Sequence, residues 1–159
     1  MMNTMLQWLE DSSCAVVIRQ SAWLYPILEI VHITGIVLLV GPSFMFDLRL
    51  LGFSKHLPVL ELAQHLLPWA RRSLLLIIPS GLLLFITNAE TLGYDPVFWI
   101  KMVFLVLAGL NVLVFHRYTF RSLSTQDKKS ILPKAAKVTA CISIIAWLII
   151  IACGRLLAY

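Results

Sequence analysis

The sequence is poor in charged residues, and this scarcity indicates the class of protein that it encodes. Asp, Glu, Lys and Arg together make up 13% of its 159 residues, against about 25% in a typical soluble domain. Hydrophobic residues make up 60%. This composition excludes an ordinary soluble domain and predicts an integral membrane protein. The net charge of +5 does not indicate a nucleic-acid partner, because the basic residues gather in loops beside apolar runs.

The sequence also lacks the short motifs that identify several enzyme classes. It contains no P-loop, GxSxG, HExxH or dinucleotide-binding glycine pattern, which argues against a nucleotide enzyme or a soluble-type hydrolase. The three cysteines show no CxxC spacing, and we interpret them as small apolar residues. The first ten residues lack both a basic segment and an apolar run, so no cleavable signal peptide is expected.

Long apolar runs occupy most of the chain. A helix that crosses a bilayer needs about 20 mostly apolar residues, and four runs meet this length: 22–40, 69–87, 97–115 and 138–157. We therefore predict an all-α integral membrane four-helix bundle that forms a single domain over residues 1–159. Residues 1–20 are predicted to form a short amphipathic segment on the outer surface.

The distribution of basic residues predicts how the helices are oriented. The segments that join the first run to the second and the third run to the fourth are basic, whereas residues 88–96 carry only Glu90 and Asp95. Basic loops stay in the cytoplasm. Both termini are therefore expected on the outer, periplasmic side of a bacterial inner membrane.

Three ionisable residues lie within the apolar runs and are functional candidates, because charge in hydrocarbon is costly. Glu29 and His32 are three residues apart and share one helix face. Lys101, in the third run, and Arg155, near the end of the fourth, reach a similar depth. We predict that Glu29, His32, Lys101 and Arg155 form a polar cluster in the outer leaflet. The structural alternative is an ion pair of Glu29 with Lys101 that joins two spans.

Glycines follow His32 on the same run. Gly35 and Gly41 are small enough to let another helix, or a flat ligand, approach the backbone closely. This combination of an intramembrane histidine with small neighbours makes His32 the strongest single candidate for a binding residue.

A second group of polar residues is predicted at the inner membrane boundary. Asp47 and Arg49 lie there in a continuing apolar sequence. His65 and His116 reach comparable depth and are candidate axial ligands of a haem, with Arg71 and Arg72 near its propionates. The alternative is that these residues only anchor the helices at the interface. A di-iron site is not expected, because the Glu29-x-x-His32 pair has no second Glu-x-x-His partner.

These motifs resemble those of a family of small four-span bacterial membrane proteins of unassigned function. The resemblance covers nearly the whole chain and rests on Trp23-Leu24-Tyr25-Pro26, Glu29, His32-x-x-Gly35, Gly41, Asp47-Leu48-Arg49-Leu50-Leu51-Gly52, Asp95-Pro96-x-Phe98-x-x-Lys101, Asn111 and His116. The Asp-Leu-Arg-Leu-Leu-Gly string is its most specific part.

More distantly, the chain resembles the copper-resistance D membrane domain and the bacterial membrane protoporphyrinogen oxidase, which is thought to bind haem b. Both groups share a first-span histidine followed by small residues, and a third span that opens with Phe or Leu before a lysine. By position, this resemblance implies that His32 and Lys101 are the functional residues. The remaining signature of the oxidase is not clearly present, so the resemblance does not extend to that specific activity.

Three functions remain open on the sequence. The first is a haem b protein of membrane electron transfer, with His32 as a ligand of the haem iron, and with quinone or another membrane subunit as partner. The second is a non-catalytic subunit that anchors or helps to assemble a larger membrane complex, or that forms a homo-oligomer. The third is a transport module for copper or another small solute. No nucleic-acid partner is expected, and catalytic residues are not assigned.

Overall fold

The chain is helical throughout the part that the computed structural model describes, which is residues 2–115, 117 and 134–157. Its helices are α1 (Met2–Glu10), α2 (Ser13–Gln20), α3 (Leu24–Leu51), α4 (Val59–Thr87), α5 (Ala89–Tyr94), α6 (Pro96–Val114) and α8 (Lys134–Leu156). No strand occurs among these residues. The prediction of an all-α protein is confirmed for this part of the chain.

Four of the helices, α3, α4, α6 and α8, are long and apolar enough to cross a membrane. The predicted number of long apolar helices is thereby confirmed, and it indicates a multi-pass membrane protein. Helix α3 continues to Leu51, well beyond the predicted run, and contains Pro42. A proline removes one backbone hydrogen bond. The helix nevertheless continues past it, and burial of Phe46 and Leu50 beyond the proline favours this continuation.

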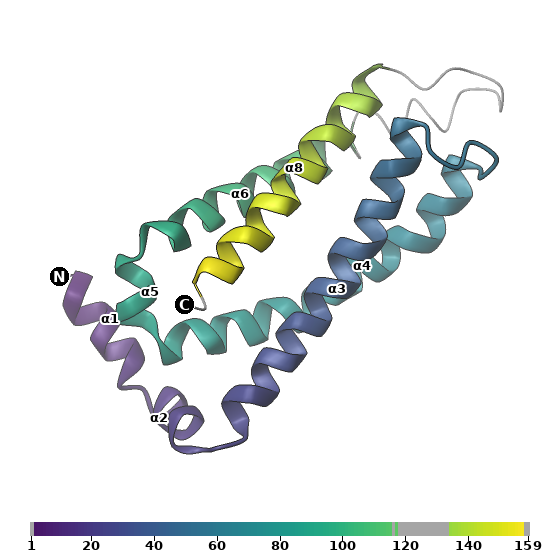
Figure 1. The fold of residues 1–159 in the computed structure, drawn as a ribbon. Coiled ribbons are helices and arrows are strands. Elements are labelled where there is room, and N and C mark those ends of the chain that lie inside the picture. The colour runs from purple at the N-terminus through teal and green to yellow at the C-terminus, as the bar shows by residue number, and fades with distance from the viewer. Residues whose placement is uncertain (1, 116, 118–133, 158–159) are drawn as a thin grey trace.

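The long helices pack as two antiparallel pairs, α3 with α4 and α6 with α8, which are joined mainly where α3 meets α8. Figure 1 shows that both chain ends, together with α1, α2 and α5, lie at one end of the molecule, which we call the terminal end. The α3–α4 connection lies at the opposite end, which we call the loop end. All four long helices therefore connect the same two ends.

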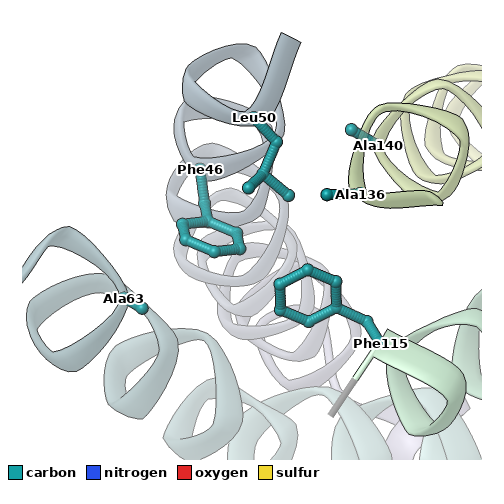
Figure 2. Packing of buried hydrophobic residues seen from close by; sticks show 6 residues of the cluster. All are labelled: Phe46, Leu50, Ala63, Phe115, Ala136 and Ala140. Atoms are coloured by element: carbon teal, nitrogen blue, oxygen red, sulfur yellow. The ribbon is translucent and has the colours of Figure 1, made fainter. Parts of the chain in front are cut away.

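The main apolar core lies at the loop end. Figure 2 shows the side chains that meet there from α3, α4 and α8 and from the residue that follows α6; they are Phe46, Leu50, Ala63, Phe115, Ala136 and Ala140. The rings of Phe46 and Phe115 meet edge to face, with 5.5 Å between their centroids. The small alanines of α4 and α8 leave room for these two rings. This cluster therefore joins α3, α4 and α8 at the loop end.

A second apolar cluster lies further along α6 and α8 and contacts α3. It consists of Ala108, Ala146, Trp147 and Ile150, with Leu39, Val40, Phe104 and Leu105 packed against it. The two clusters together hold the α6–α8 pair against α3. The polar residues around Asp47 lie between the two clusters.

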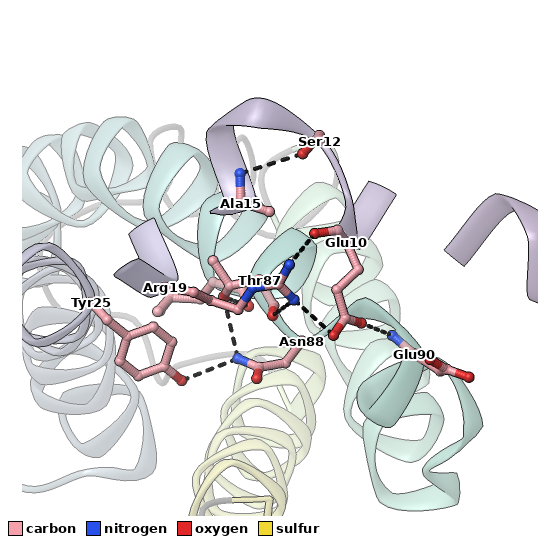
Figure 3. A network of polar contacts seen from close by, with 9 residues as sticks. Glu10, Ser12, Ala15, Arg19, Tyr25, Thr87, Asn88 and Glu90 are labelled. Carbon is pink, nitrogen blue, oxygen red and sulfur yellow. Dashed lines mark hydrogen bonds and ion pairs between the residues drawn. The ribbon is translucent and has the colours of Figure 1, made fainter. Parts of the chain in front are cut away.

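The short helices at the terminal end are attached to α4 and α5 by polar contacts. Ser12 caps α2, where its Oγ accepts a hydrogen bond from the Ala15 N–H at 3.4 Å, as is favourable at a helix N-terminus. Arg19 forms an ion pair of 2.9 Å with Glu10 and donates to the Thr87 carbonyl at 3.3 Å. Glu10 in turn accepts from the Glu90 N–H at 2.8 Å. Figure 3 shows this network, which ties α1 and α2 to the end of α4.

Replacing Arg19 with alanine is expected to loosen the N-terminal helices without unfolding the bundle. The ion pair with Glu10 is partly exposed, so its loss should change the free energy of unfolding by at most about 1 kcal/mol. Hydrogen–deuterium exchange of the purified protein should become faster in α1 and α2 alone. Gln20→Ala, at an adjacent exposed position, is the matched control. Equal exchange in the two variants would contradict a fastening role for Arg19.

Candidate functional site

His32 lies at a close approach of α3 and α4. Its Nδ1 is 2.9 Å from Ser80 Oγ. Its ring also lies against Gly81, where a Cβ would come within 2.9 Å of His32 Cε1. One turn further along α3, a Cβ on Gly35 would lie 2.7 Å from Ile77 Cγ1. The glycines of both helices therefore create the space in which the imidazole sits.

The hydrogen bonds of Ser80 determine which nitrogen of His32 carries the proton. The Ser80 hydroxyl donates to the Leu76 carbonyl of the preceding turn. Because its one proton is used there, its oxygen accepts from Nδ1–H of the histidine. A neutral imidazole that is protonated at Nδ1 presents a lone pair at Nε2. Ser80 thus orients the ring and leaves Nε2 as the nitrogen that can bind a metal or accept a proton.

Lys101 is half-buried on α6 and faces α8. Its Nζ lies 3.9 Å from the position that a Cβ on Gly154 would occupy, and Cys153 is within electrostatic range. The His32 ring is also within electrostatic range of this ammonium group. The charge of Lys101 thus acts on His32, although the two residues lie on helices of different pairs.

The other two members of the predicted cluster are placed differently. Glu29 is exposed on α3. Among the described residues, no ion pair joins Glu29 to Lys101, so the predicted structural pairing of these two side chains is not formed within one chain. Arg155 lies in the last turn of α8 and is exposed.

The residues predicted at the inner boundary separate into unrelated environments. Arg49 Nε donates to the Leu57 carbonyl at 2.7 Å, and its Nη2 donates to the Lys55 carbonyl at 3.2 Å. It thereby holds the α3–α4 connection. Arg72 is exposed, with its guanidinium carbon 5.9 Å from the centroid of the Trp69 ring.

The two histidines proposed as a haem pair are not seen together. His65 is exposed, and its Nδ1 lies 2.9 Å from the Glu61 carbonyl one turn earlier in α4. His116 lies outside the described residues. No group of three or more His, Cys, Asp or Glu side chains suited to a metal ion occurs in the described part of the chain.

Asp47 is buried between the helices, although its position near the end of an apolar run suggested an interfacial residue. It lines a cavity of about 50 Å³ between α3, α4, α6 and α8, which is partly open to the surroundings of the protein. The other polar lining residues are Ser43, Asn111, Thr139 and Ser143. Sequence reasoning singled out Asp47 and Asn111 but missed the three hydroxyl residues. A sequence signal was available, because Ser43 and Asp47, like Thr139 and Ser143, are four residues apart and share a helix face.

The comparison with protein-family models gives one match, which covers residues 5–159 and is described as a family of unknown function, DUF6644. The chain belongs to this family. The DUF6644 match includes all four long helices, and so both His32 and the Asp47 cavity lie within the region that defines the family. No curated protein and no solved structure matches the chain.

Proposed function

We propose that this DUF6644 protein binds haem b within the membrane and takes part in electron transfer, with His32 Nε2 as an axial ligand of the iron. The observation that carries the proposal is the hydrogen bond between His32 Nδ1 and Ser80 Oγ. Histidines that ligate metals commonly donate their other ring N–H to a fixed acceptor, which sets the tautomer and the ring orientation. Ser80 supplies such an acceptor inside a spanning helix pair.

The residues around His32 fit part of what a haem requires. A haem carries two propionates, and the ammonium group of Lys101 on the other helix pair is within electrostatic range of His32. The described part of the chain offers no second histidine beside His32. If haem binds, a second ligand of its iron would have to be supplied by a residue such as Met102 or by a histidine of a second copy. When bound, the haem supplies a one-electron couple that quinone or another membrane subunit can use.

We propose further that the protein lies in a bacterial inner membrane with the terminal end outside. The α3–α4 connection and the start of α8 carry basic residues, among them Arg49, Lys55 and Lys134. The α5 segment between α4 and α6 carries the acidic residue Glu90. Basic segments are retained in the cytoplasm, which would put the α1 and α2 helices at the periplasmic surface.

An absorbance spectrum tests the haem proposal directly. The full-length protein would be expressed in cells that can supply haem, purified in mild detergent, and measured oxidised and then reduced with dithionite. We expect a Soret band, and α and β bands that sharpen on reduction. A featureless spectrum at full protein recovery would overturn the proposal.

A second candidate function is a non-catalytic subunit that anchors a larger complex. Gly41 on α3 and Gly109 on α6 are exposed, and no atom of the described chain lies within 4 Å of a Cβ built at either position. Small exposed residues allow a helix of another subunit to approach closely. Native mass spectrometry of the protein extracted in mild detergent would test this candidate, which predicts co-purification of a defined partner and no chromophore.

A further inference from the structure

The cavity around Asp47 is unusual because it places a carboxyl group between two apolar clusters. Asp47 is 7% exposed. The Ser143 hydroxyl lies beside it in the lining of the cavity, while Asp47 Oδ2 is buried with no hydrogen-bond partner in the structure. A buried carboxylate oxygen without a partner costs several kcal/mol of desolvation free energy in general. Something that the cavity can accommodate is therefore expected to compensate for it.

Several polar groups around Asp47 have lone pairs that they can present to the cavity, beside the donor N–H groups of Trp147 and Asn111. The Ser43 hydroxyl donates to the Leu39 carbonyl at 2.7 Å. The Thr139 hydroxyl lies 3.1 and 3.0 Å from the carbonyls of Ala135 and Ala136, to which it donates. A hydroxyl has one proton and two lone pairs, so both oxygens keep lone pairs free once these bonds are made.

The side-chain amide of Asn111 also forms a hydrogen bond with a backbone carbonyl. Its Nδ2 donates to the Thr139 carbonyl at 3.0 Å, which ties α6 to α8 and leaves the side-chain carbonyl oxygen as an acceptor. The cavity is thus lined by one carboxyl group and several neutral oxygens from three helices. No lysine, arginine or histidine is among the residues that line it.

We propose that this cavity is a binding site for a small monovalent cation of the Na⁺ type, with Asp47 as its single charged ligand. Hard cations prefer oxygen ligands from carboxylates, carbonyls and hydroxyls. A single carboxylate balances one positive charge in a low-dielectric interior, where a divalent ion would leave a net charge. The absence of a His, Cys, Asp and Glu cluster from the described residues argues against a transition metal at this position.

The volume of the cavity is sufficient for a bound ion, which simple protonation of Asp47 would not require. A proton needs no space, whereas about 50 Å³ is room for an ion or for a small number of water molecules. The cation site does not depend on the haem proposal, because His32 lies nearer the terminal end of α3 and is not among the residues that line the cavity.

The site is tested by measuring the thermal unfolding of the detergent-purified full-length protein in choline chloride, with NaCl, LiCl or KCl substituted at constant ionic strength. We expect Na⁺ to raise the midpoint by about 3 °C for each tenfold increase above its dissociation constant. Broadening of the ²³Na resonance by the protein, reversed by Li⁺, would report binding without unfolding. A midpoint that is the same in choline and in all three salts would overturn the proposal.

Two variants and a control assign the effect to the cavity. Asp47→Asn keeps the shape of the side chain but removes its charge, and we expect it to abolish the dependence on Na⁺. Glu61→Gln, at an exposed carboxyl group of α4, should keep the full dependence. If Asp47→Asn fails to fold, Thr139→Val serves as the second variant. Valine keeps the shape of threonine but lacks the hydroxyl ligand, and we expect this change to weaken Na⁺ binding about tenfold. Unchanged Na⁺ binding in the Asp47 or Thr139 variant would overturn the site.

An infrared measurement distinguishes cation binding from a permanently protonated Asp47. A protonated carboxyl group gives a C=O stretching band that is lost in Asp47→Asn. We expect Na⁺ to suppress this band in the unsubstituted protein. A band that persists unchanged at saturating Na⁺ would show that only a proton occupies the site, and would contradict the proposal.

Discussion

Replacing His32 with alanine is expected to remove the haem spectrum from the purified protein while leaving the helices inserted. Ser80 orients the His32 ring so that Nε2 offers its lone pair to the iron. Alanine has no nitrogen that could replace Nε2. The Soret absorbance per protein should fall to the level of the background, and far-ultraviolet circular dichroism should remain unchanged. A variant that retains a full-strength haem spectrum would deprive the proposed function of its central residue.

Two further substitutions show whether the effect belongs to this histidine and to its hydrogen bond. Ser80→Ala removes the acceptor of Nδ1–H and keeps the imidazole, and we expect haem affinity to fall about 10–100-fold, as is typical when the group that orients a metal ligand is lost. His65→Ala should keep the full spectrum, because His65 is exposed near the other end of α4. Loss of the spectrum in His65→Ala alone would instead assign the haem to the loop end.

Replacing Gly35 with alanine is expected to destabilise the protein substantially. Its Cβ would lie 2.7 Å from Ile77 Cγ1, 3.3 Å from Leu76 Cβ and 3.4 Å from the Ile77 backbone nitrogen. Relieving these contacts requires α3 and α4 to move apart, and such overpacking costs about 1–3 kcal/mol. The loss should be seen as a lower midpoint of thermal unfolding in detergent.

Gly41→Ala is the matched control for this prediction. Gly41 lies in the same helix, but no atom of the described residues is within 4 Å of its Cβ position. Alanine is favoured over glycine in a helix interior by about 1 kcal/mol, so Gly41→Ala should be neutral or stabilising. Equal destabilisation by both substitutions would contradict a close α3–α4 approach at Gly35, and destabilisation by Gly41→Ala alone would point to a contact with another subunit.

Gly35 and Gly41 show which features of the site the sequence can predict and which it cannot. Both follow His32 in the same apolar run, and the sequence gives them the same interpretation, as places where a helix or ligand approaches. The structure gives this role to Gly35 only, because Gly35 faces α4 and Gly41 faces away from the other helices. Helical periodicity indicates which residues share a face, but it does not indicate which neighbour that face meets.

The predicted polar cluster has a similar outcome. The prediction that His32 and Lys101 lie close together followed from their depth in antiparallel spans, and the structure places them within electrostatic range. The ion pair of Glu29 with Lys101 followed from charge alone and is not formed. Depth follows from the rise of a helix and its connections, whereas the partner of a charge depends on how the helices are rotated about their axes.

Asp47 shows most clearly what the sequence could not predict about the site. Its place near the end of an apolar run suggested a residue at the membrane boundary, yet it is buried beside Ser143 and Asn111. The burial follows from the extension of α3 past Pro42, and from the contact between the α3–α4 pair and the α6–α8 pair. Neither of these features is visible in the local sequence around Asp47.

The sequence alone therefore determined the all-α class and the number of long apolar helices, because both depend on composition and on the length of apolar runs. The tertiary structure decided which groups meet: Ser80 with His32, the oxygens of three helices around Asp47, and Arg19 with Glu10 and the end of α4. These contacts depend on how helices distant in the sequence rotate and cross. That arrangement depends on packing between segments, such as Gly35 against Ile77 and Phe46 against Phe115, and not on any single segment.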